Sequence, residues 1–90
     1  MKSSTRHDKI IARVHWIVGQ VAAIGRSVSA EAPCVDTLHF VSAVRGAISA
    51  LMDELIQQHL RSQVAARDLS DEDRQKAATE LATVLRRYIR

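Results

Sequence analysis

The sequence predicts an all-α fold, and three features of its composition and spacing support that prediction. The chain has 90 residues, of which 47% are hydrophobic but only 3% aromatic, so its core must be built from aliphatic side chains. It contains three glycines and one proline, too few for the many turns of a β fold. Its apolar residues recur every third or fourth position, which is the period of an α-helix. We expect one helical domain, residues 1–90, built from three helices.

The first predicted helix covers about residues 5–30. Its apolar residues alternate at spacings of four and three and form an unbroken seam: Ile10, Val14, Ile17, Val21, Ile24 and Val28. Pro33 disfavours a helical conformation at Ala32 and suits the first turn of a following helix. The first helix should therefore end near Ala30.

The second predicted helix covers about residues 33–66 and is apolar over a wide arc. Two neighbouring stripes form that arc: Val41, Val44, Ile48, Leu51 and Leu55, with Leu38, Met52 and Ile56 beside them. At about 1.5 Å per residue this helix is roughly 50 Å long, too long for a compact monomer of this size. Such an apolar surface must face more than one partner. We expect an antiparallel four-helix-bundle dimer and a dimer of dimers.

The third predicted helix covers about residues 70–89. Ser70 is followed by Asp71, Glu72 and Asp73, a capping signature in which acidic residues suit the positive end of the helix dipole. Its last turn is basic. No internal repeat or second domain is visible in the sequence.

Cys34 and His59 form the one constellation that could carry chemistry. Cys34 is the only cysteine, which excludes an internal disulfide and a two-cysteine metal site. Both residues fall on one helical stripe, 25 residues and roughly 37 Å apart. Antiparallel pairing of two such helices brings Cys34 of one chain to His59 of the other. This pair is suited to a late transition metal or to a reactive thiol. A lone cysteine is, however, more often a small buried hydrophobe.

A basic stripe runs along the first helix beside its apolar seam. Lys2, Arg6, Lys9 and Arg13 are spaced four, three and four apart, within a chain of net charge +3. Positive side chains aligned on one face are what phosphate contacts require. The alternative is an ordinary solvated face.

Several other classes of protein are disfavoured by the sequence. The N-terminus has no apolar stretch behind its charges, and no apolar run approaches the length of a bilayer span, so we expect a cytoplasmic protein without membrane association. Nothing resembles an oxyanion hole or a glycine-rich phosphate loop, so we expect no enzymatic activity. The remaining alternative is a purely structural helical bundle whose cysteine and histidine are incidental.

Over nearly its whole length, the chain resembles the CsoR/RcnR/FrmR family of small all-helical bacterial repressors. The stretches that carry the resemblance are RVHWIVGQV from Arg13, then Cys34, then AVRGAISALMDELIQQHL from Ala43 to Leu60. The tail LRRYIR looks like that of the RcnR and FrmR branch. The resemblance implies a disc-like homotetramer that binds operator DNA when unliganded and releases it when an effector binds.

The resemblance also implies an effector site made of Cys34 from one protomer and His59 from its partner, with a third position at Gln63. Copper sensors have a cysteine at that third position, and persulfide sensors need a second cysteine. Nickel and cobalt sensors tend to have histidines there and beside the N-terminus, where His7 is the only candidate. Formaldehyde sensors keep the cysteine, dispense with a good third ligand and use an N-terminal amine, here that of Met1. The resemblance thus favours formaldehyde, with Ni(II), Co(II) or Zn(II) as the alternative.

For DNA, the resemblance implies a face built from basic residues of the first helix together with Arg45. Arg13 matches this pattern. His15, Trp16 and Val18 stand where relatives are often basic, which weakens the face or alters the operator that it reads. Trp16 could instead pack between protomers. No helix-turn-helix motif is evident, so we expect readout through phosphates and DNA shape.

Overall fold

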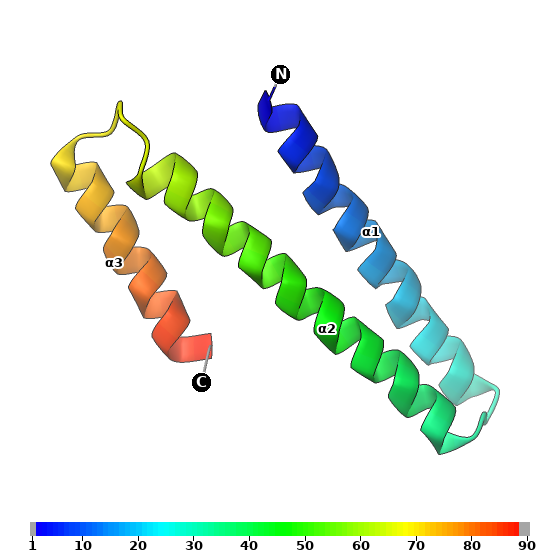
Figure 1. Ribbon diagram of the computed structural model, residues 1–90. Helices are drawn as coiled ribbons and strands as arrows, with labels where there is room; N and C mark the ends of the chain where they lie inside the picture. Colours follow the sequence, from blue (N-terminus) through cyan, green and yellow to red (C-terminus); the bar gives the residue numbers. More distant parts are fainter. Residues whose placement is uncertain (1, 89–90) are drawn as a thin grey trace. The chain divides into compact units, whose positions relative to one another are not determined.

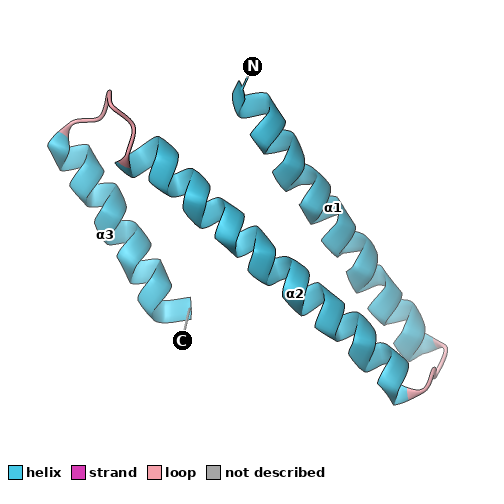
Figure 2. Cartoon of the chain, in the orientation of Figure 1, coloured by secondary structure: helices cyan, strands magenta, loops and turns pink. Residues whose placement is uncertain are grey.

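The fold is known from a computed structural model that describes residues 2–88, with side-chain surroundings from residue 6 onward. It contains α1 (Lys2–Ser29), α2 (Cys34–His59), a π-helical turn η1 (Leu60–Val64) and α3 (Asp71–Tyr88). Figure 2 shows helices joined by two short connections and, within the described range, no strand. The predicted all-α fold with three helices is confirmed.

The described residues form two compact units, one ending at Met52 and the other beginning at Asp53. The first unit contains α1 and most of α2, and the second contains the end of α2, η1 and α3. Each unit has one connection between helices, and the two connections are built differently.

In the first unit, α1 ends in a left-handed turn centred on Glu31. Glu31 has φ 54°. Its backbone N–H donates to the carbonyl of Val28 at 3.0 Å, and that of Ala32 donates to the carbonyl of Ser27, also at 3.0 Å. These two bonds form a Schellman motif, which satisfies the carbonyls left open at the end of a helix. A glycine normally occupies the left-handed position, because a side chain is strained there.

A pair of hydroxyl groups ties α1 to α2 across this turn. The Ser27 Oγ lies 2.6 Å from the Thr37 Oγ1, and Ser27 is buried. The carbonyl of Pro33 accepts from the backbone N–H of Asp36 at 2.9 Å, so Pro33 directly precedes the first turn of α2. The result is a helical hairpin (Figure 1).

In the second unit, α2 ends at His59. The sequence predicted that this helix covers residues 33–66, so the α-helix ends earlier than expected. After His59 the backbone widens into η1, where the N–H of Ala65 donates to the carbonyl of Leu60, five residues earlier, at 2.7 Å. Residues 65–70 then form an irregular connection. The apolar periodicity of α2 continues to His59 but carries no signal for the wider turn that follows.

Arg74 holds this connection together. Its Nε donates to the carbonyl of Val64 at 2.6 Å, and one terminal nitrogen donates to the carbonyl of Ala66 at 2.9 Å. The same nitrogen reaches the carbonyl of Leu69 at 3.4 Å, and the other contacts the carboxylate of Asp71 at 3.3 Å. One guanidinium thus binds the end of η1, the connection and the start of α3.

The predicted start of α3 is confirmed by its hydrogen bonds. The hydroxyl of Ser70 accepts from the backbone N–H of Asp73 at 3.0 Å, which is the bond that an N-cap residue makes. Three acidic residues follow in the first turn, and two arginines lie in the last. The helix therefore carries charges of both signs where its dipole favours them.

A single chain buries little of its apolar surface. Among residues 6–88, Val44 and Ala77 are the buried hydrophobic residues. Large exposed apolar side chains lie on all three α-helices and η1: Ile11, Trp16, Val18, Val21, Val28, Val35, Leu38, Phe40, Val41, Ile48, Leu55, Leu60, Val84 and Tyr88. With two hydrophobic residues buried and this many large ones in water, a lone chain has little core of its own among these residues.

No helix within residues 2–88 combines the length and the apolar character needed to span a bilayer.

Candidate functional site

Cys34 is the first residue of α2, directly after Pro33, and its thiol is free and exposed. Its position follows from the sequence, because the proline ends the turn and fixes where the new helix begins. The structure thus presents a single soft nucleophile to solvent at the loop end of the hairpin. The expectation that a lone cysteine is a buried hydrophobe does not hold in the protomer.

His59 is the last residue of α2 and is half-buried. Its Nε2 lies 3.0 Å from the carbonyl oxygen of Ala77 in α3. A carbonyl can only accept, so Nε2 carries the hydrogen, and in the neutral ring the lone pair is on Nδ1. A bond of this kind orients an imidazole and fixes which nitrogen can bind a ligand or accept a proton.

Gln63, at the expected third position, lies in η1 and is exposed. The π-helical turn begins directly after His59 and is held at its far end by Arg74. Single π-helical turns are frequent at functional sites, since they reorient the side chains that follow. Gln63 is thus presented by a turn of unusual geometry and not by a regular continuation of α2.

The predicted effector residues occupy the two ends of α2, with Cys34 at its start and His59 at its end. His7 lies near the start of α1 and is exposed, whereas Met1 lies outside the described residues. Within residues 2–88 of one chain, no three histidine, cysteine, aspartate or glutamate side chains are close enough together to hold a metal ion.

The basic stripe lies on α1. Arg6 and Lys9 are exposed, and Arg13 is half-buried. Lys2 belongs to the first turn of α1, but its side chain lies outside the described set. On α2, Arg45 is exposed.

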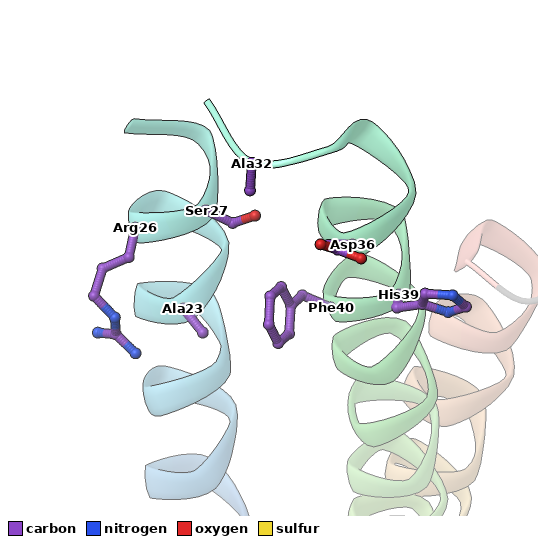
Figure 3. A pocket seen from close by; sticks show the side chains of 7 residues that line it. All are labelled: Ala23, Arg26, Ser27, Ala32, Asp36, His39 and Phe40. Atoms are coloured by element: carbon purple, nitrogen blue, oxygen red, sulfur yellow. The ribbon is translucent and has the colours of Figure 1, made fainter. Parts of the chain in front are cut away.

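A pocket that sequence reasoning missed lies in the first unit, beside the turn that joins α1 to α2 (Figure 3). It has a volume of about 460 Å³ and is open to solvent. Its lining is mixed: Ala23, Arg26, Ser27, Ala32, Asp36, His39 and Phe40. Figure 3 shows the Phe40 ring between the two helices. No motif marks these residues in the sequence, because the turn brings together positions that carry no shared pattern.

Two further contacts near the candidate site had no sequence signal. Nothing in the sequence distinguishes Arg74 from the other arginines. In the structure, its bonds to three carbonyls hold the connection after η1. The partner of His59 is a backbone carbonyl, and every residue has one. Only the packing of α3 determines which carbonyl the imidazole meets.

Comparison with known proteins places these features in context. A model of the metal-sensitive transcriptional repressor family matches residues 6–87. An uncharacterized protein in the bioA 5′ region of Serratia marcescens is 37% identical, over 98% of this chain and 99% of that protein. The transcriptional repressor RcnR of Salmonella paratyphi B is 34% identical, over 92% of this chain and 91% of the repressor.

Among solved structures, a variant of the formaldehyde-responsive regulator FrmR from Salmonella enterica serovar Typhimurium has a similar fold. The TM-score is 0.89, the sequences are 32% identical, and the match covers 94% of this chain and 96% of that one. The order of three helices described above is thus shared with a regulator of known structure.

Proposed function

Because the chain belongs to the metal-sensitive transcriptional repressor family, we propose that it binds operator DNA and is released when formaldehyde reacts at Cys34. The family membership and the likeness to RcnR and FrmR support a repressor. The choice of formaldehyde rests on the residues at the positions that the family resemblance implies, and one observation carries it: the Cys34 thiol is exposed, while the implied third position holds Gln63, whose amide is a poor metal ligand.

The proposed reaction joins an amine and the thiol through the carbon of formaldehyde. The N-terminal amine of Met1 adds to the aldehyde, water leaves, and the Cys34 sulfur attacks the resulting iminium carbon. The product is an N–CH₂–S bridge, with one water released and no change in oxidation state. Attack requires the thiolate, so the thiol proton must go to a nearby base.

His59 of the partner subunit is that base in our proposal. The bond from its Nε2 to the carbonyl of Ala77 leaves the Nδ1 lone pair available to accept the thiol proton. Since Cys34 and His59 occupy opposite ends of one helix, two antiparallel copies of α2 bring unlike ends together. The bond to Ala77 then links the site to α3.

The assembly in this proposal is a homotetramer, a dimer of dimers. The exposed seam residues Val21 and Val28 of α1 and the exposed apolar side chains of α2 support it, because a lone chain leaves them in water. Burial of apolar surface contributes about 25 cal/mol per Å², so pairing these faces is the main source of stability open to so small a protein.

A metal ion is the second candidate effector, and the description of the family as metal-sensitive favours it. A thiolate and an imidazole suit Ni(II), Co(II) or Zn(II). The ligands would be Cys34, His59 of the partner subunit and His7, with Nδ1 as the coordinating nitrogen of His59. In this case the amine of Met1 would have no role.

Native mass spectrometry of the reduced protein distinguishes these effectors. We expect a tetramer that gains the mass of one carbon per chain with formaldehyde, the balance of CH₂O added and H₂O lost. The same treatment should release DNA in a fluorescence-anisotropy titration. Parallel samples receive Ni(II), Co(II) or Zn(II) in place of formaldehyde.

Two variants and one matched control complete the test. Cys34→Ala should abolish the adduct and the release while leaving DNA binding intact, and His59→Gln should slow the adduct. His39→Gln, which alters an exposed histidine elsewhere on α2, should change neither. Stoichiometric metal uptake without a carbon adduct would contradict formaldehyde sensing and favour the metal alternative. A tetramer that takes up neither would contradict both.

A further inference from the structure

The basic stripe of α1 continues into an aromatic side chain. Counting from Lys2, the positions 6, 9, 13 and 16 follow at spacings of four and three, so Trp16 is the next member after Arg13. At 100° per residue, the five positions share an arc of roughly 80° on the helix. Asp8, the one acidic residue of α1, lies outside that arc.

Trp16 is unusually accessible for its type. Half of its surface is exposed in the protomer, whereas tryptophan is normally one of the more buried residues. The next stripe residue toward the N-terminus is Arg13, which is half-buried, and beyond it lie the exposed cations Lys9 and Arg6. An indole at the end of a row of cations presents an apolar face and one N–H donor to a polyanion that those cations attract.

We propose that Trp16 contacts the DNA directly, as the apolar member of the DNA-binding face of α1. This inference rests on the repressor function proposed above and adds to it a named contact of a different kind from a phosphate bond. From Arg6 to Trp16 the stripe extends about 15 Å. The major groove of B-DNA is about 12 Å wide. The stripe is therefore long enough for cations near one end to bind phosphates while the indole meets the sugars and base edges.

Charge and chemistry favour DNA over a second protein chain as the occupant of this face. A protein partner would have to bury Trp16 together with Arg6 and Lys9, and removing those charges from water without acidic partners is costly. DNA supplies the phosphates for the cations and the apolar sugar and base surfaces for the ring. Unlike a phosphate contact, an apolar contact of the indole releases no counterions, so salt does not weaken it.

Salt dependence is the signature that separates this contact from a structural role. The DNA is a duplex selected by the intact protein from a random pool, and its Kd is measured over a range of salt concentrations. Trp16→Ala should weaken binding about tenfold with an unchanged slope of log Kd against log salt. Lys9→Ala should weaken binding and lower that slope by about one. Trp16→Phe should retain most of the affinity.

Fluorescence provides an independent readout, because the chain has one tryptophan. In the free protein, acrylamide should quench Trp16 efficiently, and saturating DNA should protect it. Ile11→Ala removes an exposed apolar side chain from another face of α1 and should leave affinity and quenching unchanged. Native mass spectrometry of Trp16→Ala should show the same assembly as the unsubstituted protein.

Two results would overturn the inference while leaving the repressor function in place. One is a Trp16 already shielded in the free protein and unaffected by DNA. The other is a Trp16→Ala variant that dissociates into smaller species, which would assign Trp16 to an interface between protomers. If the folded, unsubstituted protein selects no duplex at all, the repressor proposal fails and this inference fails with it.

Discussion

The two connections between helices bind their open backbone carbonyls with different groups. The turn after α1 is closed by the backbone, through the N–H groups of Glu31 and Ala32, with one hydroxyl pair across it. The connection before α3 is closed by a side chain, since Arg74 binds the carbonyls of Val64, Ala66 and Leu69. A backbone-closed turn depends little on any one side chain, whereas the second connection depends on a single residue. The second connection also adjoins η1, which presents Gln63.

The largest effect is expected from Arg74→Met. The variant keeps the aliphatic stem but loses charge-assisted bonds to three carbonyls and a carboxylate, so we expect a loss of about 2 kcal/mol in the free energy of unfolding. Urea denaturation at fixed protein concentration measures it, because oligomer stability depends on concentration. The matched control is Arg67→Met, an exposed arginine of the same connection, which should change stability by less than about 0.5 kcal/mol. Equal effects of the two variants would contradict the role given to Arg74.

A smaller effect is expected for the hydroxyl pair in the first unit. Ser27→Ala and Thr37→Val should each destabilise the protein by about 1 kcal/mol, because each leaves the other hydroxyl without its partner. In a double-mutant cycle the second substitution should cost less than it does alone, with a coupling of about 1 kcal/mol. Strictly additive losses would show that the 2.6 Å contact contributes nothing to stability.

The smallest effect, and the only gain, is expected from Glu31→Gly. Glycine adopts the left-handed conformation of residue 31 without the strain of a side chain, which outweighs its larger loss of chain entropy on folding. We expect a stabilisation of roughly 0.5 kcal/mol, seen as a higher urea midpoint with an unchanged slope. Glu31→Ala keeps a side chain at the same φ and should show no such gain.

The helices were predictable because their signals are local. The apolar seam from Ile10 to Val28, the proline at 33 and the cap at Ser70 each act within a few residues, and the structure follows all three. The end of the second helix was not predictable. The wide turn at Leu60–Val64 depends on carbonyls that Arg74 reaches from the next helix, and no residue within the turn encodes that contact.

The candidate site also has features that were predictable from the sequence and features that only the structure shows. Periodicity places Cys34 and His59 on one stripe of α2, and the family resemblance adds the third position at Gln63. The orientation of the His59 ring came only from the structure, since its partner is the backbone of Ala77. The exposure of Trp16 also came only from the structure, because the stripe alone cannot tell a buried ring from an accessible one.

By itself, the sequence determined that this protein is made of three helices, where their apolar faces lie and which residues share a face. These properties follow from side-chain spacing and short-range hydrogen bonding, which act within a turn or two of helix. Tertiary structure alone decided how the chain passes from α2 to α3, which nitrogen of His59 is left free and how far Trp16 meets solvent. Each of these depends on atoms distant in sequence. The partner of His59, for example, is a backbone carbonyl. Because every residue has such a carbonyl, the sequence cannot show which one packing brings to the ring.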